Sequence, residues 1–305
     1  MPIALVGYGK IASDQHERAI ATTTSFALAA VVDPVARHPS LNSFADVEAL
    51  LRQRPDIPAL ALCQPPRFRL EAGLAALRAG RHVLLEKPPG LDLAQVHQLA
   101  MLAAERGLAL YTAWHSQMGA AIDPARQWLA GQAIRHVAVT WCEDVRRWHP
   151  GQHWIMQEGG FGVFDPVINA FSILTALLPG PLAVEAARLD VPANCGAPIA
   201  GAVALRAADG VGIALEMDFL KQGEQIWDIA IETDAGTLVI GGHGNTLSLD
   251  GVAMPVPQEA EYRRLYDRFA QLIASGQSEV DVEPLRLACN ALATGERRPV
   301  ADFHF

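Results

Sequence analysis

Residues 1 to about 115 alternate short, unbroken apolar runs with amphipathic stretches. The apolar runs are IALVG, FALAAVVD, ALALCQ, HVLLEK and LALYTAW. Segments whose apolar residues have helical spacing lie between them, such as LEAGLAALRAG and DLAQVHQLAMLAAERG. The segment SFADVEALLRQ predicts another helix, with Ser43 as its N-cap and Asp46 in its first turn. Apolar strands buried on both faces are typical of a parallel sheet covered by helices on each side. Residues 1–118 are therefore expected to form an α/β domain with a doubly wound parallel sheet.

From about residue 119 the pattern changes to strands in near succession. HVAVTWCEDV, AVEAARLDV, GAVALRA, GVGIALEMDF, IWDIAIET and GTLVI predict strands, and turn sequences such as AADG and TDAG separate some of them. Direct links between strands indicate a mostly antiparallel sheet. Two helices are expected in DPVINAFSILTALL and EYRRLYDRFAQLIAS. Residues 119–305 are therefore expected to form an α+β domain with a large, mostly antiparallel open sheet.

The charge of the chain narrows its range of partners. Its 305 residues carry a formal net charge of −9, with a pI of about 5.5. An acidic surface repels phosphate backbones, so no nucleic-acid partner is expected. The N-terminal sequence MPIALVGYGK leads directly into a strand, and no apolar run is long enough to span a bilayer. No membrane partner is expected either.

The cysteines and the paired histidines argue against a metal site. No two cysteines form a C-x-x-C pair, which indicates neither a zinc ribbon nor a disulfide scaffold and fits a reduced cytoplasm. His149 and His153 have metal-like spacing, but Pro150 and Gly151 between them keep the two off one helical face. The four cysteines are Cys63, Cys142, Cys195 and Cys289.

A glycine motif follows the first predicted strand. In VGYGKIA, Gly7 permits a tight turn, Gly9 lets the backbone approach a pyrophosphate, and Ala12 keeps the next helix close to the strand. An ordinary tight turn is the alternative. The strand before and the helix after favour a Rossmann domain that binds a dinucleotide, with Lys10 and Ile11 also in the cofactor loop.

An acidic residue ends the second predicted strand. Asp33 lies at the distance expected for a carboxylate that binds the adenosine ribose diol, and its charge would repel a 2′-phosphate. Pro34 stands where an NADP enzyme often has arginine. NAD is therefore expected to be preferred, with weaker use of NADP that Arg37 and His38 nearby could support. The alternative is that Asp33 is only a turn residue before Pro34.

Two later strands end in sequences that lie at the same edge of the predicted sheet. CQPP ends the third long strand, and HVLLEKPPG delivers a Glu–Lys pair before two prolines that stiffen the exit. Ligands of open α/β sheets bind outside the carboxyl ends of the strands. The alternative without a function is that the Glu–Lys pair is only the solvent-exposed end of a strand. Cofactor-binding residues are expected at Cys63, Gln64, Pro65, Glu86 and Lys87.

These motifs together resemble the glucose–fructose oxidoreductase/inositol dehydrogenase (Gfo/Idh/MocA) family of sugar oxidoreductases. The segment WCEDVRRWHPGQHWIMQEGGFGVFDPVINAFSIL, with LLEKPPG, TAWHS and SEVDVEPLRL, is similar to its aldose 1-dehydrogenases, which act on sugars such as D-galactose and L-arabinose. The arabinose type carries a Ser-Arg-like segment where this chain has Asp33 and Pro34. The cofactor preference is therefore not carried over from it.

The resemblance implies roles for residues of both halves. Lys87 and Asp165 would be catalytic, and six further residues would bind the sugar. Asp165 and Asn169 share a helical face, but Asp165 alone could be only a helix N-cap. Glu143 could instead form a surface pair with a neighbouring arginine. The expected sugar-binding residues are Glu143, His149, Asn169, His115, Trp148 and Trp227.

The expected reaction is NAD-dependent oxidation of an aldopyranose at C1 to the aldonolactone. D-Galactose is the first choice, with L-arabinose and D-fucose also accepted, and Lys87 and Asp165 are expected to share the O1 proton. Three alternatives stay open: an NADP-preferring L-arabinose 1-dehydrogenase, an inositol-type secondary-alcohol dehydrogenase, and a non-catalytic sugar or NAD sensor. Inositol-type members carry D-x-x-x-H on the helix that here has Asp165 and Asn169. By analogy with that family, residues 119–305 are expected to serve substrate binding and oligomerisation, and the protein is expected to be a homodimer or homotetramer.

Overall fold

The computed structural model describes residues 1–258 and 260–305, which divide into two compact units. The first contains Met1–His115 and Ala260–Val282, and the second contains Ser116–Glu259 and Glu283–Phe305. The predicted domain boundary at 118/119 lies close to the point where the chain passes from the first unit to the second, after His115. The prediction, however, places 260–282 in the second domain. The structure differs there because this returning segment packs within the first unit.

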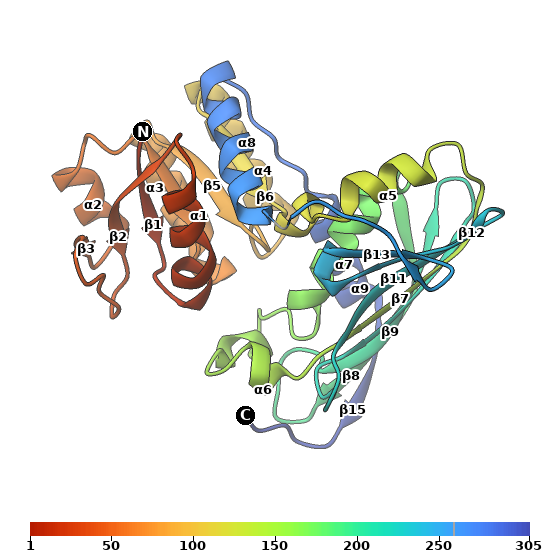
Figure 1. Ribbon diagram of the computed structural model, residues 1–305. Coiled ribbons are helices and arrows are strands. Elements are labelled where there is room, and N and C mark those ends of the chain that lie inside the picture. Colours follow the sequence, from red (N-terminus) through yellow and green to blue (C-terminus); the bar gives the residue numbers. More distant parts are fainter. Residues whose placement is uncertain (259) are drawn as a thin grey trace. The chain divides into compact units, whose positions relative to one another are not determined.

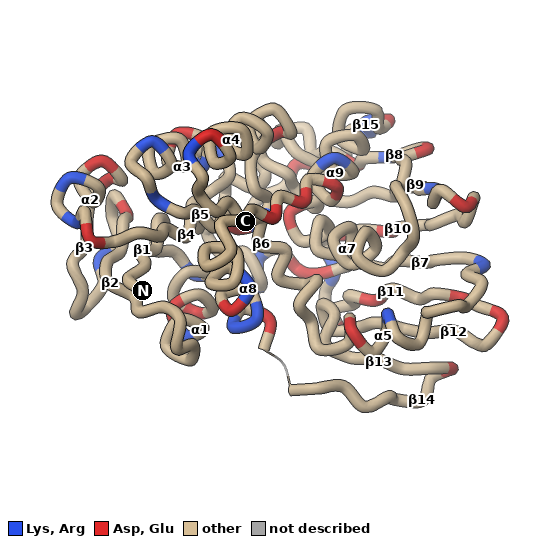
Figure 2. Tube along the Cα trace, turned by 90° about the horizontal axis from the view of Figure 1, so that it is seen from above, with Lys and Arg blue, Asp and Glu red and all other residues tan. Residues whose placement is uncertain are grey.

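The first unit is built on a parallel sheet of six strands, in the order β3-β2-β1-β4-β5-β6 (Figure 2). This order is that of a doubly wound dinucleotide-binding fold, as the sequence predicts. Strands β1, β4, β5 and β6 are buried almost throughout, whereas only the second half of β2 is buried. The strands are β1 (Pro2–Val6), β2 (Ala27–Val32), β3 (Asn42–Phe44), β4 (Ala59–Leu62), β5 (His82–Glu86) and β6 (Leu110–Ala113).

Side-chain caps fix the starts of two helices in this unit. Asp46 accepts a hydrogen bond from Ala49 N at 2.7 Å, so Asp46 is the N-cap and the prediction of Ser43 was wrong. Ser43 lies in β3 instead. Asp92 caps the next long helix in the same way. The helices are η1 (Ala12–His16), α1 (Glu17–Thr22), α2 (Val47–Gln53), η2 (Pro66–Phe68), α3 (Arg69–Arg78), α4 (Leu93–Arg106) and α8 (Glu261–Ser275).

Helix α8 contacts α1 and β6 of the first unit, and its ribbon is labelled in Figure 1. Aromatic side chains form this packing. Phe269 stacks on Phe26 with ring centroids 5.6 Å apart and on Tyr111 at 6.3 Å. Tyr266 contacts Phe26 edge-on. Fully burying a side chain such as that of Phe269 stabilises a fold by about 1.5–3 kcal/mol. This apolar contact explains why the sequence position of α8 misleads about its domain.

The second unit is built on a nine-stranded sheet in the order β14-β13-β12-β11-β7-β10-β9-β8-β15 (Figure 2). The pairs β7–β10 and β8–β15 are parallel and the others are antiparallel, so the predicted mostly antiparallel sheet is confirmed. The strands are β7 (Ile134–Cys142), β8 (Leu182–Pro192), β9 (Ala200–Ala207), β10 (Gly212–Asp218), β11 (Ile226–Thr233), β12 (Gly236–Gly241), β13 (Thr246–Leu249), β14 (Val252–Ala253) and β15 (Glu296–Val300).

Helices of the second unit contact one another and the sheet (Figure 1). On β7, Val137, Val139 and Trp141 are buried, whereas the alternating Ala138 and Thr140 are only partly buried. This two-residue period marks one covered face and one more open face. Helices α5 and α9, and strand β15, are not anticipated from the sequence. The helices are η3 (His115–Met118), α5 (Ile122–Leu129), α6 (Val145–Trp148), η4 (His153–Met156), α7 (Phe164–Leu177), η5 (Gly242–Gly244) and α9 (Glu283–Thr294).

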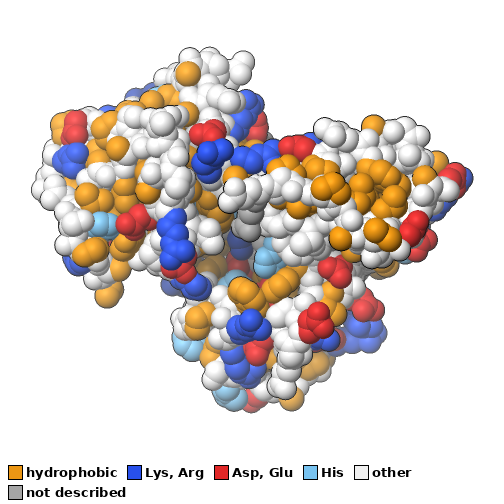
Figure 3. Space-filling model, in the orientation of Figure 1, with side chains coloured by type: hydrophobic (Ala, Val, Ile, Leu, Met, Phe, Trp, Pro, Cys, Tyr) orange, Lys and Arg blue, Asp and Glu red, His pale blue; other side chains and the backbone are white. Residues whose placement is uncertain are grey.

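Charged side chains of both signs are interspersed on the face that Figure 3 shows. Across the described ranges, no helix combines the length and the apolar character needed to cross a bilayer.

Candidate active site

The glycine loop after β1 has the geometry of a phosphate-binding turn. Gly7 has φ +85°, and a Cβ there would lie 2.5 Å from Gln64 N, so the turn itself requires glycine. At Gly9 an added Cβ would meet nothing within 4 Å, which leaves that backbone open to a ligand. Ala12 is fully buried where the helix meets the sheet, and Lys10 and Ile11 form the start of that helix. The loop therefore fits a dinucleotide pyrophosphate.

Asp33 connects the glycine loop to the end of β2. Its Oδ2 accepts from Tyr8 N at 2.9 Å, and its Oδ1 accepts from Val35 N and Ala36 N. Burial raises the pKa of Asp33, but these backbone hydrogen bonds outweigh it and leave the pKa lowered. Asp33 is thus a turn residue, and it is also an ionised carboxylate at the edge where a ribose would lie. The two sequence interpretations are compatible.

The two basic side chains that follow Asp33 are engaged locally. Arg37 donates to the carbonyl of Asp33 at 2.8 Å. His38 Nε2 lies 3.1 Å from a carboxylate oxygen of Glu17, whose other oxygen accepts from the Tyr8 hydroxyl. These contacts use both side chains without requiring a 2′-phosphate.

The loop after β4 forms another part of the cofactor half-site. Cys63 N donates to the carbonyl of Val6 at 2.7 Å, so this loop runs beside the glycine turn. Gln64 donates through Nε2 to Phe68 O, and its buried Oε1 has no hydrogen-bond partner among residues 1–258 and 260–305. Pro65 precedes the short helix η2. A buried, unsatisfied acceptor at this edge fits a bound polar ligand.

A buried guanidinium fixes the main chain on both sides of Lys87. Arg69, only 3 % exposed, donates through Nη1 to the carbonyls of Glu86 and Pro88. Its Nε donates to Gln64 O at 2.8 Å, which links the ends of β4 and β5. The Lys87–Pro88 peptide is cis. Lys87 itself is partly buried. Arg69 thereby defines where the Lys87 side chain begins.

Glu86 lies in a buried polar network that reaches α8. Glu86 Oε1 accepts from the Tyr262 hydroxyl at 2.9 Å and lies 3.4 Å from His16 Nε2. His16 Nδ1 is 2.8 Å from the Tyr266 hydroxyl. Both His16 and Glu86 are almost completely inaccessible to solvent. The network joins the helix after the glycine loop, strand β5 and helix α8.

His16 and Glu86 stabilise each other's charged form. Burial raises the pKa of Glu86, but His16, His115 and Lys87 lower it to about 2. Burial lowers the pKa of His16, whereas Cys63 and Glu86 raise it to about 10. Each group therefore favours ionisation of the other. The Glu86 carboxylate next to Lys87 is consequently ionised at neutral pH.

His115 lies at the end of the first unit and contacts α8. Its Nδ1 is 2.9 Å from Glu261 Oε2, and its ring stacks on Tyr262 with centroids 5.2 Å apart. The imidazole orientation is therefore fixed from two sides. The predicted sugar contact of His115 stays a prediction.

The second unit contains five of the six predicted sugar-binding residues, together with Asp165. Glu143 is only 2 % exposed. Its Oε2 accepts a hydrogen bond from Trp227 Nε1 at 2.8 Å, and its Oε1 lies 3.0 Å from His149 Nε2. The surface alternative for Glu143 is wrong, because Arg146 donates to the carbonyl of His304 instead. The guanidinium of Arg147 lies over the Trp148 ring. Glu143 is an interior acceptor held by two donors.

Asp165 and Asn169 face the same region from α7. Asp165 lies in the first turn of this helix and is 4 % exposed, while Val163 occupies the N-cap position. The N-cap alternative for Asp165 is therefore wrong. His149 Nδ1 lies 3.9 Å from Asp165 Oδ2, so the imidazole stands between two carboxylates. Asn169 is 7 % exposed, and its buried Oδ1 has no partner in the described part of the chain.

Aromatic rings lie next to this polar group. Trp148 and Trp227 meet edge to face with ring centroids 5.2 Å apart, and Trp148 is 36 % exposed. His243, which sequence reasoning missed, lies 4.0 Å from the Trp227 ring centroid. An indole face next to hydroxyl-binding groups suits the apolar C–H face of a sugar ring.

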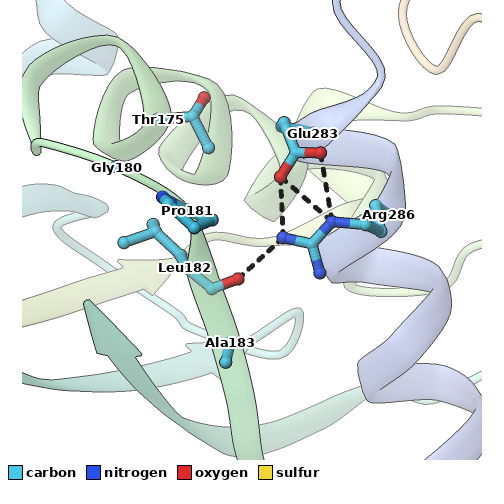
Figure 4. Close-up of a pocket in the computed structure, with 7 residues that line it drawn as sticks. All are labelled: Thr175, Gly180, Pro181, Leu182, Ala183, Glu283 and Arg286. Atoms are coloured by element: carbon cyan, nitrogen blue, oxygen red, sulfur yellow. Dashed lines mark hydrogen bonds and ion pairs between the residues drawn. The ribbon is translucent and has the colours of Figure 1, made fainter. Parts of the chain in front are cut away.

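Two shallow hollows lie outside the predicted residues. One of about 480 Å³ in the second unit contains the paired Glu283 and Arg286, and Arg286 also donates to Leu182 O at 2.7 Å (Figure 4). The other, about 370 Å³, lies in the first unit beside Glu17 and His38. Their charged groups are already paired. Neither hollow adds a candidate site.

The structure thus forms a cofactor half-site in the first unit and a sugar half-site in the second. Lys87 belongs to the first and Asp165 to the second, so their meeting in one chamber stays a prediction. Sequence reasoning missed the residues that hold these side chains in place. A histidine between glycines in GGHGN was an available signal for one of them, whereas an arginine at a helix start gave none. The missed residues are His16, Arg69, His243, Tyr262 and Tyr266.

Comparison with known proteins places the chain in a family. Residues 1–113 match the model described as "Oxidoreductase family, NAD-binding Rossmann fold" (GFO_IDH_MocA). The galactose 1-dehydrogenase of Pseudomonas fluorescens is 41% identical over 302 residues, covering 99% of this chain and 98% of that protein.

Solved structures agree over nearly the whole length. The D-galactose-1-dehydrogenase of Rhizobium etli is 46% identical, with a TM-score of 0.94 over 99% of this chain and 97% of that one. A 3-ketoreductase of Actinomadura kijaniata, solved with NADP and TDP-benzene, has a TM-score of 0.85 at 19% identity, covers 98% of this chain and 99% of that one, and supports the fold alone. The chain therefore belongs to the Gfo/Idh/MocA family of oxidoreductases, and its first unit is the NAD-binding Rossmann domain of that family.

Proposed function

We propose that the protein is an NAD-dependent aldose 1-dehydrogenase that oxidises D-galactose at C1 to the aldonolactone. The observation that carries the proposal is the buried group of Glu143, His149, Asp165 and Asn169 beside two indole rings. A sugar presents several hydroxyls and an apolar face, and this group offers acceptors and aromatic surface to match both. Two relatives named galactose 1-dehydrogenase, similar over nearly the full chain, support the same substrate.

The buried acceptors assign roles in binding. Asn169 Oδ1 would accept a hydroxyl hydrogen bond from the sugar, since an unsatisfied buried acceptor is costly without a ligand. Glu143 and His149 would bind neighbouring hydroxyls while Trp227 holds the Glu143 carboxylate. Trp148 would pack on the C–H face. Such fixed donors and acceptors orient the anomeric carbon.

Proton handling is assigned to two residues. Lys87 and Asp165 would share the proton that leaves O1, and His149 beside Asp165 would orient that carboxylate. The glycine loop, Asp33 and the loop after β4 would hold NAD, whose nicotinamide would serve as the hydride acceptor. The lactone then opens in water to the acid.

A panel of aldoses tests the substrate assignment. D-Galactose with NAD is expected to give the highest kcat/KM, followed from absorbance at 340 nm. L-Arabinose and D-fucose share the C2, C3 and C4 configuration of galactose, and they lack only its CH₂OH group or its C6 hydroxyl. They should therefore fall within about 10–200-fold of galactose when no buried polar group binds the C6 hydroxyl. myo-Inositol should react far more slowly. Oxidation of inositol but not of aldoses would contradict the proposal in favour of a ring-alcohol dehydrogenase, and no oxidation at all would favour a sensor.

The carboxylate of Asp33 is expected to set the cofactor preference. Wild-type protein should have a higher kcat/KM with NAD than with NADP, because the ionised carboxylate repels a 2′-phosphate. Asp33→Asn keeps the size and removes the charge, so the NAD/NADP ratio should fall at least about tenfold. Steady-state kinetics with both cofactors measure this ratio.

Asp46→Asn is the matched control, since Asp46 also accepts a backbone N–H but caps a different helix. Its NAD/NADP ratio should equal that of wild type. Equal or better use of NADP by the unaltered protein would contradict the role of Asp33.

A further inference from the structure

His243 occupies a backbone conformation that favours glycine. Its φ is +60°, and it lies between Gly242 at φ +56° and Gly244 at φ +99°. Among residues 1–258 and 260–305, only one other non-glycine residue, Asp250, has positive φ. A left-handed residue with a Cβ is strained and persists only where its surroundings hold it there. A histidine at this position therefore indicates that the ring is needed.

Neighbouring contacts fix the loop that carries His243. Ala121 N donates to Gly244 O at 2.9 Å, and Ala120 N donates to Asn245 Oδ1 at 3.0 Å. Asn245 N closes the turn onto Gly241 O. The loop is thus anchored to the segment before α5 and to the end of β12. The strain at His243 is held by the fold and does not depend on the imidazole alone.

The imidazole lies among three tryptophan rings. Its centroid is 4.0 Å from that of Trp227, 5.4 Å from that of Trp141 and 6.4 Å from that of Trp148. Trp141 and Trp227 are directly opposite one another on β7 and β11. His243 therefore packs across a cross-strand aromatic pair and also contacts the more exposed third ring.

Trp227 connects His243 to the sugar half-site. Its Nε1 donates to Glu143 Oε2 at 2.8 Å, and the other oxygen of Glu143 contacts His149. An indole that tilted would lose this hydrogen bond and leave a buried carboxylate with one donor fewer. We infer that His243 is a positioning residue that holds the Trp227 indole against Glu143 and so sets affinity for the sugar. This inference rests on the proposed oxidation of galactose.

Two variants remove the ring and leave a residue suited to left-handed backbone. His243→Gly relieves the strain, and His243→Asn keeps a polar side chain that tolerates this conformation. Both should raise KM for galactose about tenfold with kcat within about threefold of wild type, because substrate positioning is lost before proton transfer. The melting temperature of His243→Gly should equal or exceed that of wild type. Tryptophan emission should also change, since a ring in contact with Trp227 is lost.

Asp250→Gly is the control, because it relaxes the other positive-φ position outside both half-sites. Its KM should equal that of wild type. Wild-type KM in both His243 variants, or a raised KM with a melting temperature below that of wild type, would overturn the role of His243. Failure of the unaltered protein to oxidise galactose would instead remove the proposed function, so the two failures are distinguishable.

Discussion

Lys87→Met is expected to lower kcat for galactose oxidation at least about 100-fold, because the variant has no amine to handle the O1 proton. The methionine retains a long apolar stem, and Arg69 still fixes the carbonyls on both sides of position 87. The local backbone should therefore persist, and NAD should bind with an affinity close to that of wild type. Steady-state kinetics and titration of NAD against protein fluorescence measure the two effects separately.

Lys87→Arg separates charge from proton transfer. Arginine keeps the positive charge next to Glu86 but does not give up its proton at working pH. This variant should be as slow as Lys87→Met within about tenfold. Recovery of near-normal kcat by arginine would show that charge alone is needed, and near-normal kcat in the methionine variant would remove Lys87 from the mechanism.

Asp165→Asn is expected to lower kcat by a similar factor, at least about 100-fold. The side chain is 4 % exposed and lies beside His149, so replacing carboxylate by amide removes a proton acceptor with little change in volume. KM should change less than kcat, because Glu143 and Asn169 remain to bind the sugar. Initial rates over a range of galactose concentrations, at saturating NAD, measure both constants.

The chain offers a closely matched control for that substitution. Asp123 is likewise the second residue of a helix and is followed by proline, but its side chain is 49% exposed and pairs with Arg126. Asp123→Asn should leave kcat unchanged. Near-normal kcat in Asp165→Asn would contradict the assigned role.

A double variant tests whether the two residues serve one step. If Lys87 and Asp165 share a single proton, Lys87→Met combined with Asp165→Asn should be about as slow as the slower single variant. Two independent steps would instead give multiplied losses. A double variant as slow as the slower single variant would indicate that the two side chains act on the same proton.

The sequence predicts those features of the fold that depend on local physics. The buried strands of the first unit carry continuous apolar runs, and the glycine loop follows β1 directly, so both can be anticipated from neighbouring residues. Gly7 shows why, because its positive φ and the nearby Gln64 backbone together demand glycine. The mostly antiparallel second sheet follows from short turns between strands.

Features that depend on distant contacts could not be predicted. Ser43 and Asp46 are both acceptable caps by composition, and the choice was settled when Ser43 entered β3. Helix α8 has an ordinary amphipathic pattern, and nothing local says that Phe269 will pack on Phe26. The membership of α8 in the first unit is therefore a tertiary outcome.

The candidate residues themselves follow from motifs, whereas the groups that hold them do not. Three carbonyls from two separate segments converge on the buried Arg69, and no sequence pattern records that convergence. The hydrogen bond from Trp227 to Glu143 likewise joins segments that are far apart along the chain. Sequence motifs therefore predict the reacting groups, whereas the contacts that hold them depend on the tertiary structure.

The division of the chain into interleaved segments has a consequence for biosynthesis. Each unit is discontinuous, since 260–282 completes the first and 283–305 completes the second. During translation the nucleotide-binding domain cannot acquire Tyr262 and Tyr266, which close the polar network around Glu86 and His16, until synthesis has passed all of residues 116–258 of the second unit. Cotranslational folding can build the six-stranded sheet early, but the nascent domain must wait for its last helix while the neighbouring domain emerges from the ribosome.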